Sequence, residues 1–285
     1  MSNLKVALIT VSYYSEGEIE KLIESIGYRP ETKKSSIQMF IVSNSGDCSK
    51  LSNQNTTVLQ SGFNAGFAKA CNIGAAAAES YDVLIFCNPD VRISAEAIFS
   101  MSEQVMNNPQ IGIVSPSFQA NIDEQVTFKE AKERIPGACY VMRNSLFKDT
   151  GGWDESFFLW GEDRDLLMRI KKLGYLVGLN FAIQAKHLSG HSWKGVSLEK
   201  EQFFTKVWIC SQTYLSIKLG SVKSGRIYCI KEIGKSLIRL ILRKKAVGRS
   251  YDNTTAIYFS ILLLFKRNLE SYVTHSKGGY SWHNK

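Results

Sequence analysis

The sequence predicts an α/β fold with a mainly parallel central sheet flanked by helices. The first observation behind this prediction is order: strand-like and helix-like segments alternate through the first 118 of the 285 residues. Such alternation is typical of parallel strands joined by crossover helices. The second observation is composition. An apolar fraction of 44% and a charged fraction of 21% are those of a globular protein, which excludes the disordered and fibrous classes.

Each predicted strand is an apolar run that ends in turn residues, and each predicted helix repeats its apolar residues at helical spacing. In the first half the order is strand 4–14, helix 16–26, strand 36–45, strand 56–61, helix 64–80, strand 81–91, helix 93–108 opened by Ser94, and strand 111–118. In the less regular second half the order is strand and short helix 137–147, glycine- and aromatic-rich loop 151–161, helix 162–174 ending at Gly174, strand 175–184 and helix 197–220.

The net charge of +9 is concentrated in the last fifth of the chain. Residues 221–285 carry 13 Lys and Arg against 3 Asp and Glu, whereas residues 1–220 carry 22 against 23. This shift in composition predicts two functional zones, a domain at 1–220 and a basic extension at 221–285.

The extension contains the segment KSGRIYCIKEIGKSLIRLILRKK, which begins at Lys223. Its apolar residues share one helical face, with Lys231, Lys235 and Arg239 recurring among them. This pattern is typical of an amphipathic helix on an anionic membrane surface. The alternative is that the helix packs on the preceding domain with its charges in water. The residues of the apolar face are Ile227, Ile230, Leu237, Ile238 and Ile241.

The six cysteines lie far apart and several fall inside apolar runs, which predicts buried free thiols in a reducing compartment. The first residues lack the pattern of a signal peptide. The apolar run 256–265 is shorter than the roughly 20 residues that span a bilayer. We therefore expect a cytoplasmic protein.

Polar residues recur where three predicted strands end, at 12–14, 43–45 and 88–90. Each group by itself is explained by turn chemistry. Together they predict a ligand site, because parallel strands bring their carboxyl ends to one edge of the sheet.

Asp90 and His187 are candidate metal ligands. A hard cation such as Mg²⁺ or Mn²⁺ needs few protein ligands when substrate phosphates complete its shell, so one carboxylate after a strand suffices. His187 would add a nitrogen ligand suited to Mn²⁺. The alternatives are a Pro-Asp turn and a structural histidine. No HExxH or four-ligand pattern for a structural zinc site occurs.

Three acids, Glu162, Asp163 and Asp165, open the helix that follows Trp160 and Gly161. Acids at a helix start are favourable for electrostatic reasons alone. Beside an aromatic loop, they also suit a general base acting on a sugar hydroxyl. Asp165 points to another face of the helix, where an arginine at 164 or 169, or a neighbouring segment, could pair with it.

The glycine- and asparagine-rich segment 62–74 opens a helix, so that helix's N-terminus could approach an anionic group. It contains neither a P-loop nor a GxGxxG fingerprint. A tight loop with a closely packed helix explains the segment equally well.

Six segments occur in the order of one known family, from about residue 4 to about residue 195. The chain resembles the family 2 inverting glycosyltransferases of the GT-A fold, especially the rhamnosyltransferase-like members that build bacterial surface polysaccharides such as O-antigen. The segments are TVSYYS, IVSNSGD, NAGFAKACNIG, LIFCNPDV, PGACYVMRNSLFKDTGGWDESFFLWGEDRDLLMRIKKLGY and KHLSGHS.

The resemblance implies a role for each matching position. Asp163 would be the catalytic base, Asp90 and His187 would hold Mg²⁺ or Mn²⁺, and Trp160 and Glu162 would line the acceptor side. Residues 1–118 would bind the nucleotide-sugar and 119–220 would form the acceptor and catalytic half. Donor contacts are expected from Ser12, Tyr13, Asn44, Asn64, Gly66, Asn72, Asn88 and Asp90.

The implied reaction transfers a sugar, with inversion, from a nucleoside-diphosphate donor to a saccharide or lipid-linked saccharide. L-Rhamnose from dTDP-rhamnose is the favoured donor, and UDP-linked galactofuranose, glucose or galactose stays open. One departure from the family concerns recognition of the pyrimidine ring of the donor nucleotide. The family has an acidic residue before Asn44, and this chain has Ser43 there, so Asn44, Asp47 or the backbone would contact the pyrimidine.

Three other functions are alternatives: a nucleotidyltransferase, a nucleic-acid-binding protein and a non-catalytic nucleotide-sugar binder. The first lacks its glycine-rich basic signature near the first strand. The second leaves the balanced charge of residues 1–220 unexplained, so no nucleic acid partner is expected. The expected location is cytoplasmic, with the extension on the inner membrane's cytoplasmic face, and a homo-oligomer stays open.

Overall fold

The computed structural model describes residues 4–27, 36–46, 48–119, 125–132, 135–188, 197–242 and 252–275. The chain forms two compact units. The first consists of Met1–Asp154 and Asp163–Leu188, and the second of Glu155–Glu162 and Ser189–Lys285. The predicted functional boundary at residue 220 follows charge rather than contacts, and it stays a prediction.

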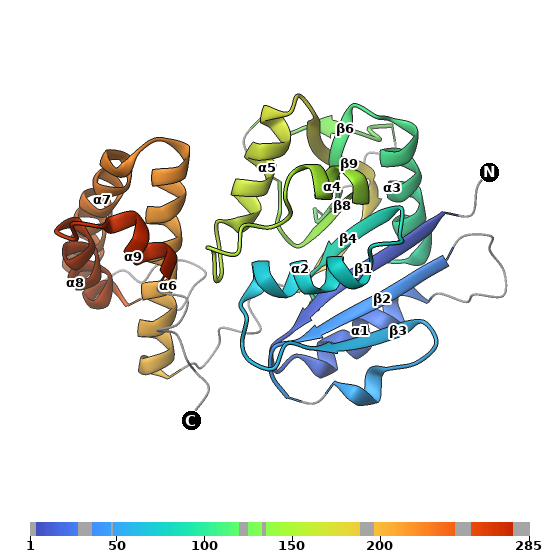
Figure 1. Cartoon of the computed structure of the whole chain (residues 1–285), viewed down its shortest axis with the longest axis horizontal. Coiled ribbons are helices and arrows are strands. Elements are labelled where there is room, and N and C mark those ends of the chain that lie inside the picture. Colours follow the sequence, from blue (N-terminus) through green and yellow to red (C-terminus); the bar gives the residue numbers. More distant parts are fainter. Residues whose placement is uncertain are drawn as a thin grey trace. The chain divides into compact units, whose positions relative to one another are not determined.

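Within the described residues of the first unit, eight strands form one sheet in the order β3-β2-β1-β4-β8-β6-β9-β7 (Figure 1). The first four strands of that order are mutually parallel, while β8 runs antiparallel to both β4 and β6. The strands are β1 (Lys5–Ser12), β2 (Ser36–Ser43), β3 (Thr56–Gln60), β4 (Val83–Cys87), β6 (Ile111–Ser117), β7 (Lys129–Glu130), β8 (Cys139–Arg143) and β9 (Leu176–Gln184).

Helices cover both faces of this sheet, and β1 shows why. Successive side chains of a strand point to opposite faces, so Val6 and Leu8 join one apolar cluster while Ala7 and Ile9 join the other. The first cluster includes residues of α1 (Glu16–Ile26) and α3 (Ala95–Asn107). The second includes residues of α2 (Phe67–Ala77), α4 (Asn144–Asp149) and α5 (Glu162–Lys172). The predicted fold class, a mainly parallel sheet flanked by helices, is confirmed.

The helix boundaries follow local sequence. Ser94 caps α3 as predicted, since its side chain accepts a hydrogen bond from the Ala97 N–H. α2 begins at Phe67 instead of residue 64, because Gly66 has a φ of +79° that ends the preceding loop. All six cysteines are buried and free, as predicted.

Apart from the loop at 155–161, the second unit is mainly helical in its described part. Its helices are α6 (Leu198–Leu219), α7 (Val222–Ile241), α8 (Asn253–Leu264) and α9 (Leu269–His275). They enclose an apolar cluster that includes Ile209, Leu215, Cys229 and Leu263. The helical character of the extension is therefore confirmed, and α8 and α9 are individual helices that sequence reasoning did not assign. Among the described residues, no helix has both the length and the apolar character needed to span a membrane.

Candidate functional site

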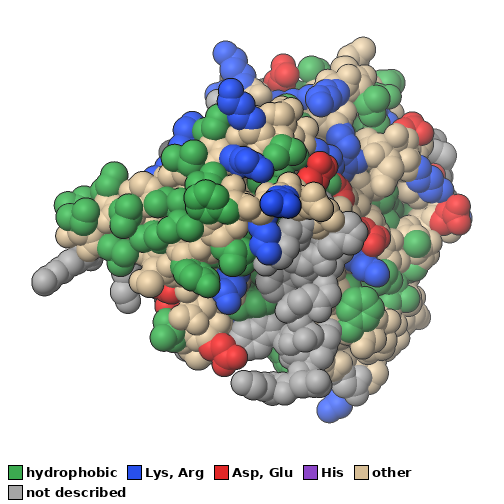
Figure 2. Space-filling model, turned by 60° about the vertical axis from the view of Figure 1, so that its left-hand side comes forward, with side chains coloured by type: hydrophobic (Ala, Val, Ile, Leu, Met, Phe, Trp, Pro, Cys, Tyr) green, Lys and Arg blue, Asp and Glu red, His purple; other side chains and the backbone are tan. Residues whose placement is uncertain are grey.

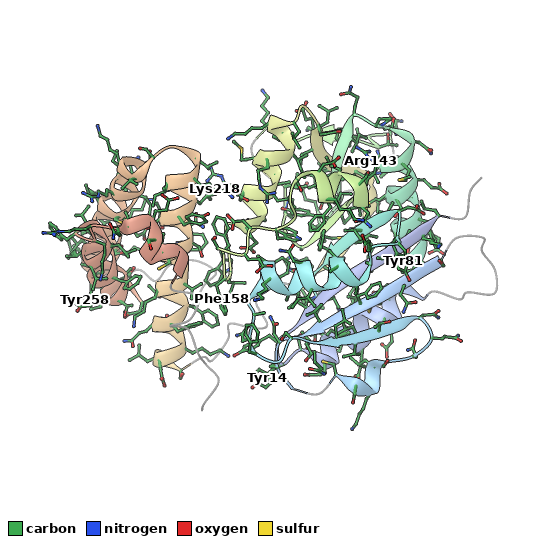
Figure 3. The ribbon with its side chains drawn as sticks, in the orientation of Figure 1. Tyr14, Tyr81, Arg143, Phe158, Lys218 and Tyr258 are labelled. Atoms are coloured by element: carbon green, nitrogen blue, oxygen red, sulfur yellow. The ribbon has the colours of Figure 1, made fainter. Side chains whose placement is uncertain are left out.

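The carboxyl ends of β1 and β2 meet, as the sequence predicted. The two strands are parallel and in register up to Ser12 opposite Ser43. Beyond the strands, the Asn44 N–H donates to the Ser12 carbonyl at 2.9 Å. The Tyr14 N–H donates to the Ser45 hydroxyl at 2.8 Å, and Tyr14 lies past the strand ends (Figure 3). Two of the three predicted groups of strand-end residues therefore form one surface.

Asn44 ties this surface to the loop before α2. Its buried side chain donates from Nδ2 to the Gly66 carbonyl at 3.0 Å. The Gly66 N–H in turn donates to Asn64 Oδ1 at 3.2 Å. Burial and then the neighbouring Tyr14 raise the pKa of Tyr13, while a hydrogen bond with the Asn64 side chain lowers that pKa in part. Four predicted donor residues thus contact one another in a chain.

The third strand end belongs to β4, which pairs with β1 on the side opposite β2. Open α/β sheets bind ligands beyond strand ends where the strand order reverses, as it does between β1 and β4. After β4 the chain turns at Asn88, whose carbonyl accepts from the Val91 N–H at 3.2 Å, and enters β5 (Val91–Arg92). Asp90 lies in this turn.

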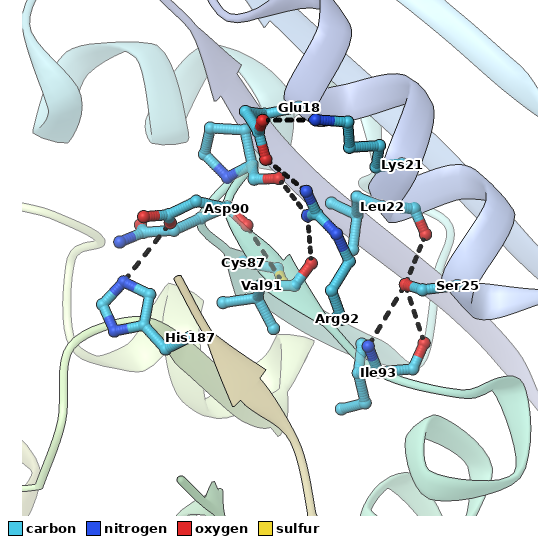
Figure 4. A network of polar contacts seen from close by, with 12 residues as sticks. Glu18, Lys21, Leu22, Ser25, Cys87, Asp90, Val91, Arg92, Ile93 and His187 are labelled. Atoms are coloured by element: carbon cyan, nitrogen blue, oxygen red, sulfur yellow. Dashed lines mark hydrogen bonds and ion pairs between the residues drawn. The ribbon is translucent and has the colours of Figure 1, made fainter. Parts of the chain in front are cut away.

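The turn brings Asp90 and His187 together. β5 pairs antiparallel with β10 (Lys186–His187), which sets His187 opposite Val91. The Leu188 N–H donates to the Asp90 carbonyl at 3.0 Å. His187 Nε2 then lies 3.3 Å from Asp90 Oδ1, and the side chains are 26% and 20% exposed (Figure 4). The two residues predicted as metal ligands are thus neighbours with access to solvent.

Their donor set fits a divalent cation. One carboxylate oxygen and one imidazole nitrogen at this spacing suit Mn²⁺, and the carboxylate alone suits Mg²⁺. Within the described part of the chain, no group of three or more His, Cys, Asp or Glu side chains could hold a metal ion. The remaining ligands would therefore have to come from elsewhere, and diphosphate oxygens are suited to that position.

Arg92 clamps the same turn, a feature that sequence reasoning missed. Its guanidinium donates to the carbonyls of Pro89 at 2.9 Å and Val91 at 2.8 Å, and it pairs with Glu18 of α1 (Figure 4). Hydrogen bonds from Lys21 first, and also from Arg92, hold the pKa of Glu18 below its ordinary value. The only sequence signal was an arginine two residues after Asp90.

Asp163 lies in the first turn of α5, and its carboxylate is linked to the same edge of the sheet. Oδ1 accepts from the Arg164 N–H at 2.7 Å. A Cβ added at Gly137 would lie 3.0 Å from Oδ2, so the absence of a side chain there makes room for the carboxylate. The next residue, Ala138, accepts from the Asn88 N–H at 2.8 Å. Residues 137 and 138 therefore lie between Asp163, the predicted catalytic base, and the turn that carries Asp90.

Asp165 is structural, as its position on the helix predicted. It is buried and its Oδ2 lies 2.9 Å from Arg169 Nε. Arg169 also donates to the Thr150 carbonyl at 2.6 Å. Asp165 therefore holds the arginine that ties α5 to the end of α4.

The two predicted acceptor residues belong to the second unit. Trp160 has a φ of +66°, a strained conformation for a bulky side chain. Its ring makes edge contacts with Phe204 and Trp208 of α6, with centroids 5.9 and 5.7 Å apart. Glu162 is buried, with 6% of its surface exposed. The unit thus holds Trp160 in an aromatic cluster, and an acceptor role for both residues stays a prediction.

Asn72 has a structural task that the sequence did not predict. Its Nδ2 donates to the Trp153 carbonyl at 2.9 Å, and its Oδ1 accepts from the Trp153 N–H at 3.0 Å. These bonds tie α2 to the loop after α4. A donor contact for Asn72 stays a prediction, and Asp47 lies outside the described residues.

Comparison with known proteins gives one short sequence match. It is 36% identity over 58 residues to N-acetylglucosaminyl-diphospho-decaprenol L-rhamnosyltransferase of Mycobacterium tuberculosis, found for two strains. The match covers 20% of this chain and 19% of that protein. No protein-family model matches the chain.

Solved structures share the fold at low sequence identity. Mannosyltransferase PcManGT from Pyrobaculum calidifontis, in complex with GDP-Man and Mn²⁺, matches with a TM-score of 0.57 and 12% identity over 98% of this chain and 74% of that one. GalNAc-T7 with UDP, GalNAc and Mn²⁺ matches with a TM-score of 0.55 and 14% identity over 75% of this chain and 50% of that one. S. aureus TarS 1-349 matches with a TM-score of 0.53 and 14% identity over 94% of this chain and 91% of that one. The chain therefore has the fold of GT-A glycosyltransferases.

Proposed function

We propose that this protein is a metal-dependent inverting glycosyltransferase. The observation that carries the proposal is the Asp90–His187 pair at the edge where β1, β2 and β4 end. It combines a divalent-cation donor set with polar strand ends on a fold shared with glycosyltransferases whose structures contain Mn²⁺ and a nucleotide or nucleotide-sugar. A nucleoside-diphosphate sugar supplies the phosphate oxygens that this donor set lacks.

For the donor we propose dTDP-L-rhamnose. The short match to an L-rhamnosyltransferase supports this choice, and UDP-linked galactofuranose, glucose and galactose are the alternatives. The relative's name also supports a lipid-linked saccharide as acceptor. The product would then contribute to a bacterial surface polysaccharide.

In the proposed reaction Asp163 takes the proton of the acceptor hydroxyl. The acceptor oxygen forms its new bond to the anomeric carbon while the bond to the diphosphate oxygen breaks, so the configuration inverts. The electron pair of the broken bond leaves with the nucleoside diphosphate. A divalent cation held by Asp90 and His187 would supply positive charge for the leaving diphosphate. Gly137 leaves the space in which the Asp163 carboxylate lies.

The first test is a thermal-shift comparison of dTDP, UDP, GDP and CMP, each with and without Mn²⁺ or Mg²⁺. A ligand that binds only the folded protein raises its stability by mass action. At about one hundred times Kd, we expect a rise of roughly 5–10 °C for dTDP with Mn²⁺. A larger shift with UDP would change the donor, and the absence of any metal-dependent shift would contradict the proposed site.

A second test concerns the clamp on the 88–91 turn. Arg92→Met removes the bonds to the Pro89 and Val91 carbonyls that hold Asp90 in place. We expect the Mn²⁺ concentration that half-saturates nucleotide binding to rise about 10–100-fold, the usual effect of losing a group that orients a metal ligand. Thermal shift with a Mn²⁺ titration at fixed dTDP measures this concentration.

The matched control is Lys21→Met, which removes the other partner of Glu18 and leaves the turn untouched. It should keep the Mn²⁺ requirement of the unaltered protein. Melting of both variants without ligand separates a general loss of stability from a change at the turn. An equal Mn²⁺ requirement in the two variants would show that Arg92 does not position Asp90.

A further inference from the structure

Helix α7 buries small and polar side chains and exposes large apolar ones, the reverse of an ordinary amphipathic helix. Its buried residues are small or polar: Gly225, Cys229, Glu232 and Ser236. At about 100° per residue they lie on one side of the helix. The helix can lie close to α6 there, because a Cβ added at Gly225 would come 2.6 Å from the Ile217 side chain.

The opposite side of α7 carries large aliphatic side chains in water. They span an arc of about 100°, and their exposed fractions run from 41% to 77%. The sequence predicted this shared face, and the structure shows that it points away from the helix's buried side. The residues are Ile227, Ile230, Leu237, Ile238 and Ile241.

Helix α8 packs beside α7 and adds to the exposed apolar area (Figure 1). Tyr258, Ile261 and Phe265 follow helical spacing along α8 and its end, so they share a side. They are 68%, 42% and 78% exposed, and Tyr258 is labelled in Figure 3. Exposed apolar side chains at such density mark a binding surface.

Basic side chains accompany these apolar ones. Lys223, Arg226, Lys231 and Lys235 of α7 are exposed. The acid of the helix, Glu232, is buried and pairs with Arg239 at 3.1 Å, so it does not offset that charge at the surface. Figure 2 shows hydrophobic side chains gathered together, with Lys and Arg side chains beside them.

We propose that this α7–α8 surface, made of the exposed apolar and basic residues named above, binds an anionic phospholipid bilayer. The aliphatic and aromatic side chains would enter the boundary between headgroups and acyl chains, and the lysines and arginine would meet the lipid phosphates. Charge decides against a second copy of the chain, because two such surfaces would bring like charges together. The proposal goes beyond glycosyl transfer and does not depend on it.

The test is sedimentation of the full chain with vesicles of phosphatidylcholine containing 30% phosphatidylglycerol, against vesicles of pure phosphatidylcholine. At low salt we expect at least tenfold stronger partitioning to the anionic vesicles. Sodium chloride at about 0.5 M should abolish most of this preference, since the Debye length is then only a few ångströms. Equal partitioning to both vesicles, or none to either, would overturn the proposal.

Two variants locate the surface. Ile230→Ser with Ile238→Ser should lower partitioning at least tenfold, and Lys231→Glu with Lys235→Glu should remove the preference for anionic lipid. The control is Met106→Ser on α3, an exposed apolar residue of the first unit, which should bind vesicles like the unaltered protein. Circular dichroism checks that each variant keeps its helices. Size-exclusion chromatography tests the alternative occupant, a second copy of the chain. If the isoleucine variant converted a dimer to monomers without changing vesicle binding, a second copy would be the occupant and the proposal would be wrong.

Discussion

Replacing Asp163 by asparagine is expected to lower the rate of sugar transfer by about 10²–10⁴-fold, the usual contribution of a general base. The amide has the shape of the carboxylate and can still accept the Arg164 N–H at the start of α5. It cannot take a proton from an acceptor hydroxyl. Nucleotide affinity should stay within about twofold, because the change removes an interaction that matters in the transition state. Turnover of donor in the presence of acceptor, with thermal shift by dTDP and Mn²⁺, measures the two quantities.

The neighbouring Asp165 provides the control for this variant. Asp165→Asn should lower the melting temperature, because it breaks a buried ion pair with Arg169. Turnover per folded molecule should change little. If Asp163→Asn kept substantial turnover, or if both variants lost turnover in proportion to lost stability, Asp163 would not be the base.

Replacing Asp90 by alanine is expected to abolish the metal-dependent part of nucleotide binding. The change removes the carboxylate of the donor set and leaves His187 as a single nitrogen ligand. Because a lone imidazole nitrogen holds a hard cation poorly, Mn²⁺ should no longer increase the thermal shift given by dTDP. His187→Ala should weaken the Mn²⁺ effect and leave part of it, since the carboxylate and the diphosphate remain. The double variant should then behave like Asp90→Ala alone, which is the non-additivity expected of two residues that hold one ion.

Asp82 offers a matched carboxylate at the other end of β4. It is exposed, and its Oδ2 accepts from the Lys5 N–H at 2.9 Å. Asp82→Ala should leave the Mn²⁺ effect unchanged. An unchanged Mn²⁺ effect in Asp90→Ala as well would remove the metal role from the 88–91 turn.

The strands and helices of the first half could be predicted from sequence because their signals are local. An apolar run bounded by turn residues identifies β1, β2 and β4, and helical spacing identifies α1. The contact between residues 12–14 and 43–45, and the position of 88–90 after the neighbouring parallel strand, followed from one further rule, the common edge of parallel strands. That rule also supplied the candidate site, since it placed Asp90 at the edge.

The position and direction of β8 could not be predicted. An apolar run such as CYVMR does not indicate which strands it pairs with, or whether the pairing is parallel or antiparallel. In the structure β8 lies between β4 and β6 and is antiparallel to both, with Cys139 opposite Cys87. This pairing brings Gly137 and Ala138 to the end of β4, so it determines how Asp163 is linked to the site.

Side-chain contacts across long stretches of sequence were likewise hidden. Arg92 and Glu18 are 74 residues apart, and nothing in either local pattern identifies the other as a partner. Asn72 matched a segment of a known family, yet its amide bonds to Trp153 are visible only in the folded chain. Local patterns predicted where polar groups would gather. Tertiary packing determined which backbone groups each polar side chain hydrogen-bonds.

The shortness of the β5–β10 ladder has a consequence for local stability. The ladder consists of two residue pairs, and it joins parts of the chain that are about a hundred residues apart. Such a short ladder can separate in a local opening that leaves the eight-stranded sheet intact. Any ligand that grips Asp90 and His187 together would bind only the closed form. Occupancy of the site and protection of these few amide hydrogens from exchange with solvent would therefore rise and fall together.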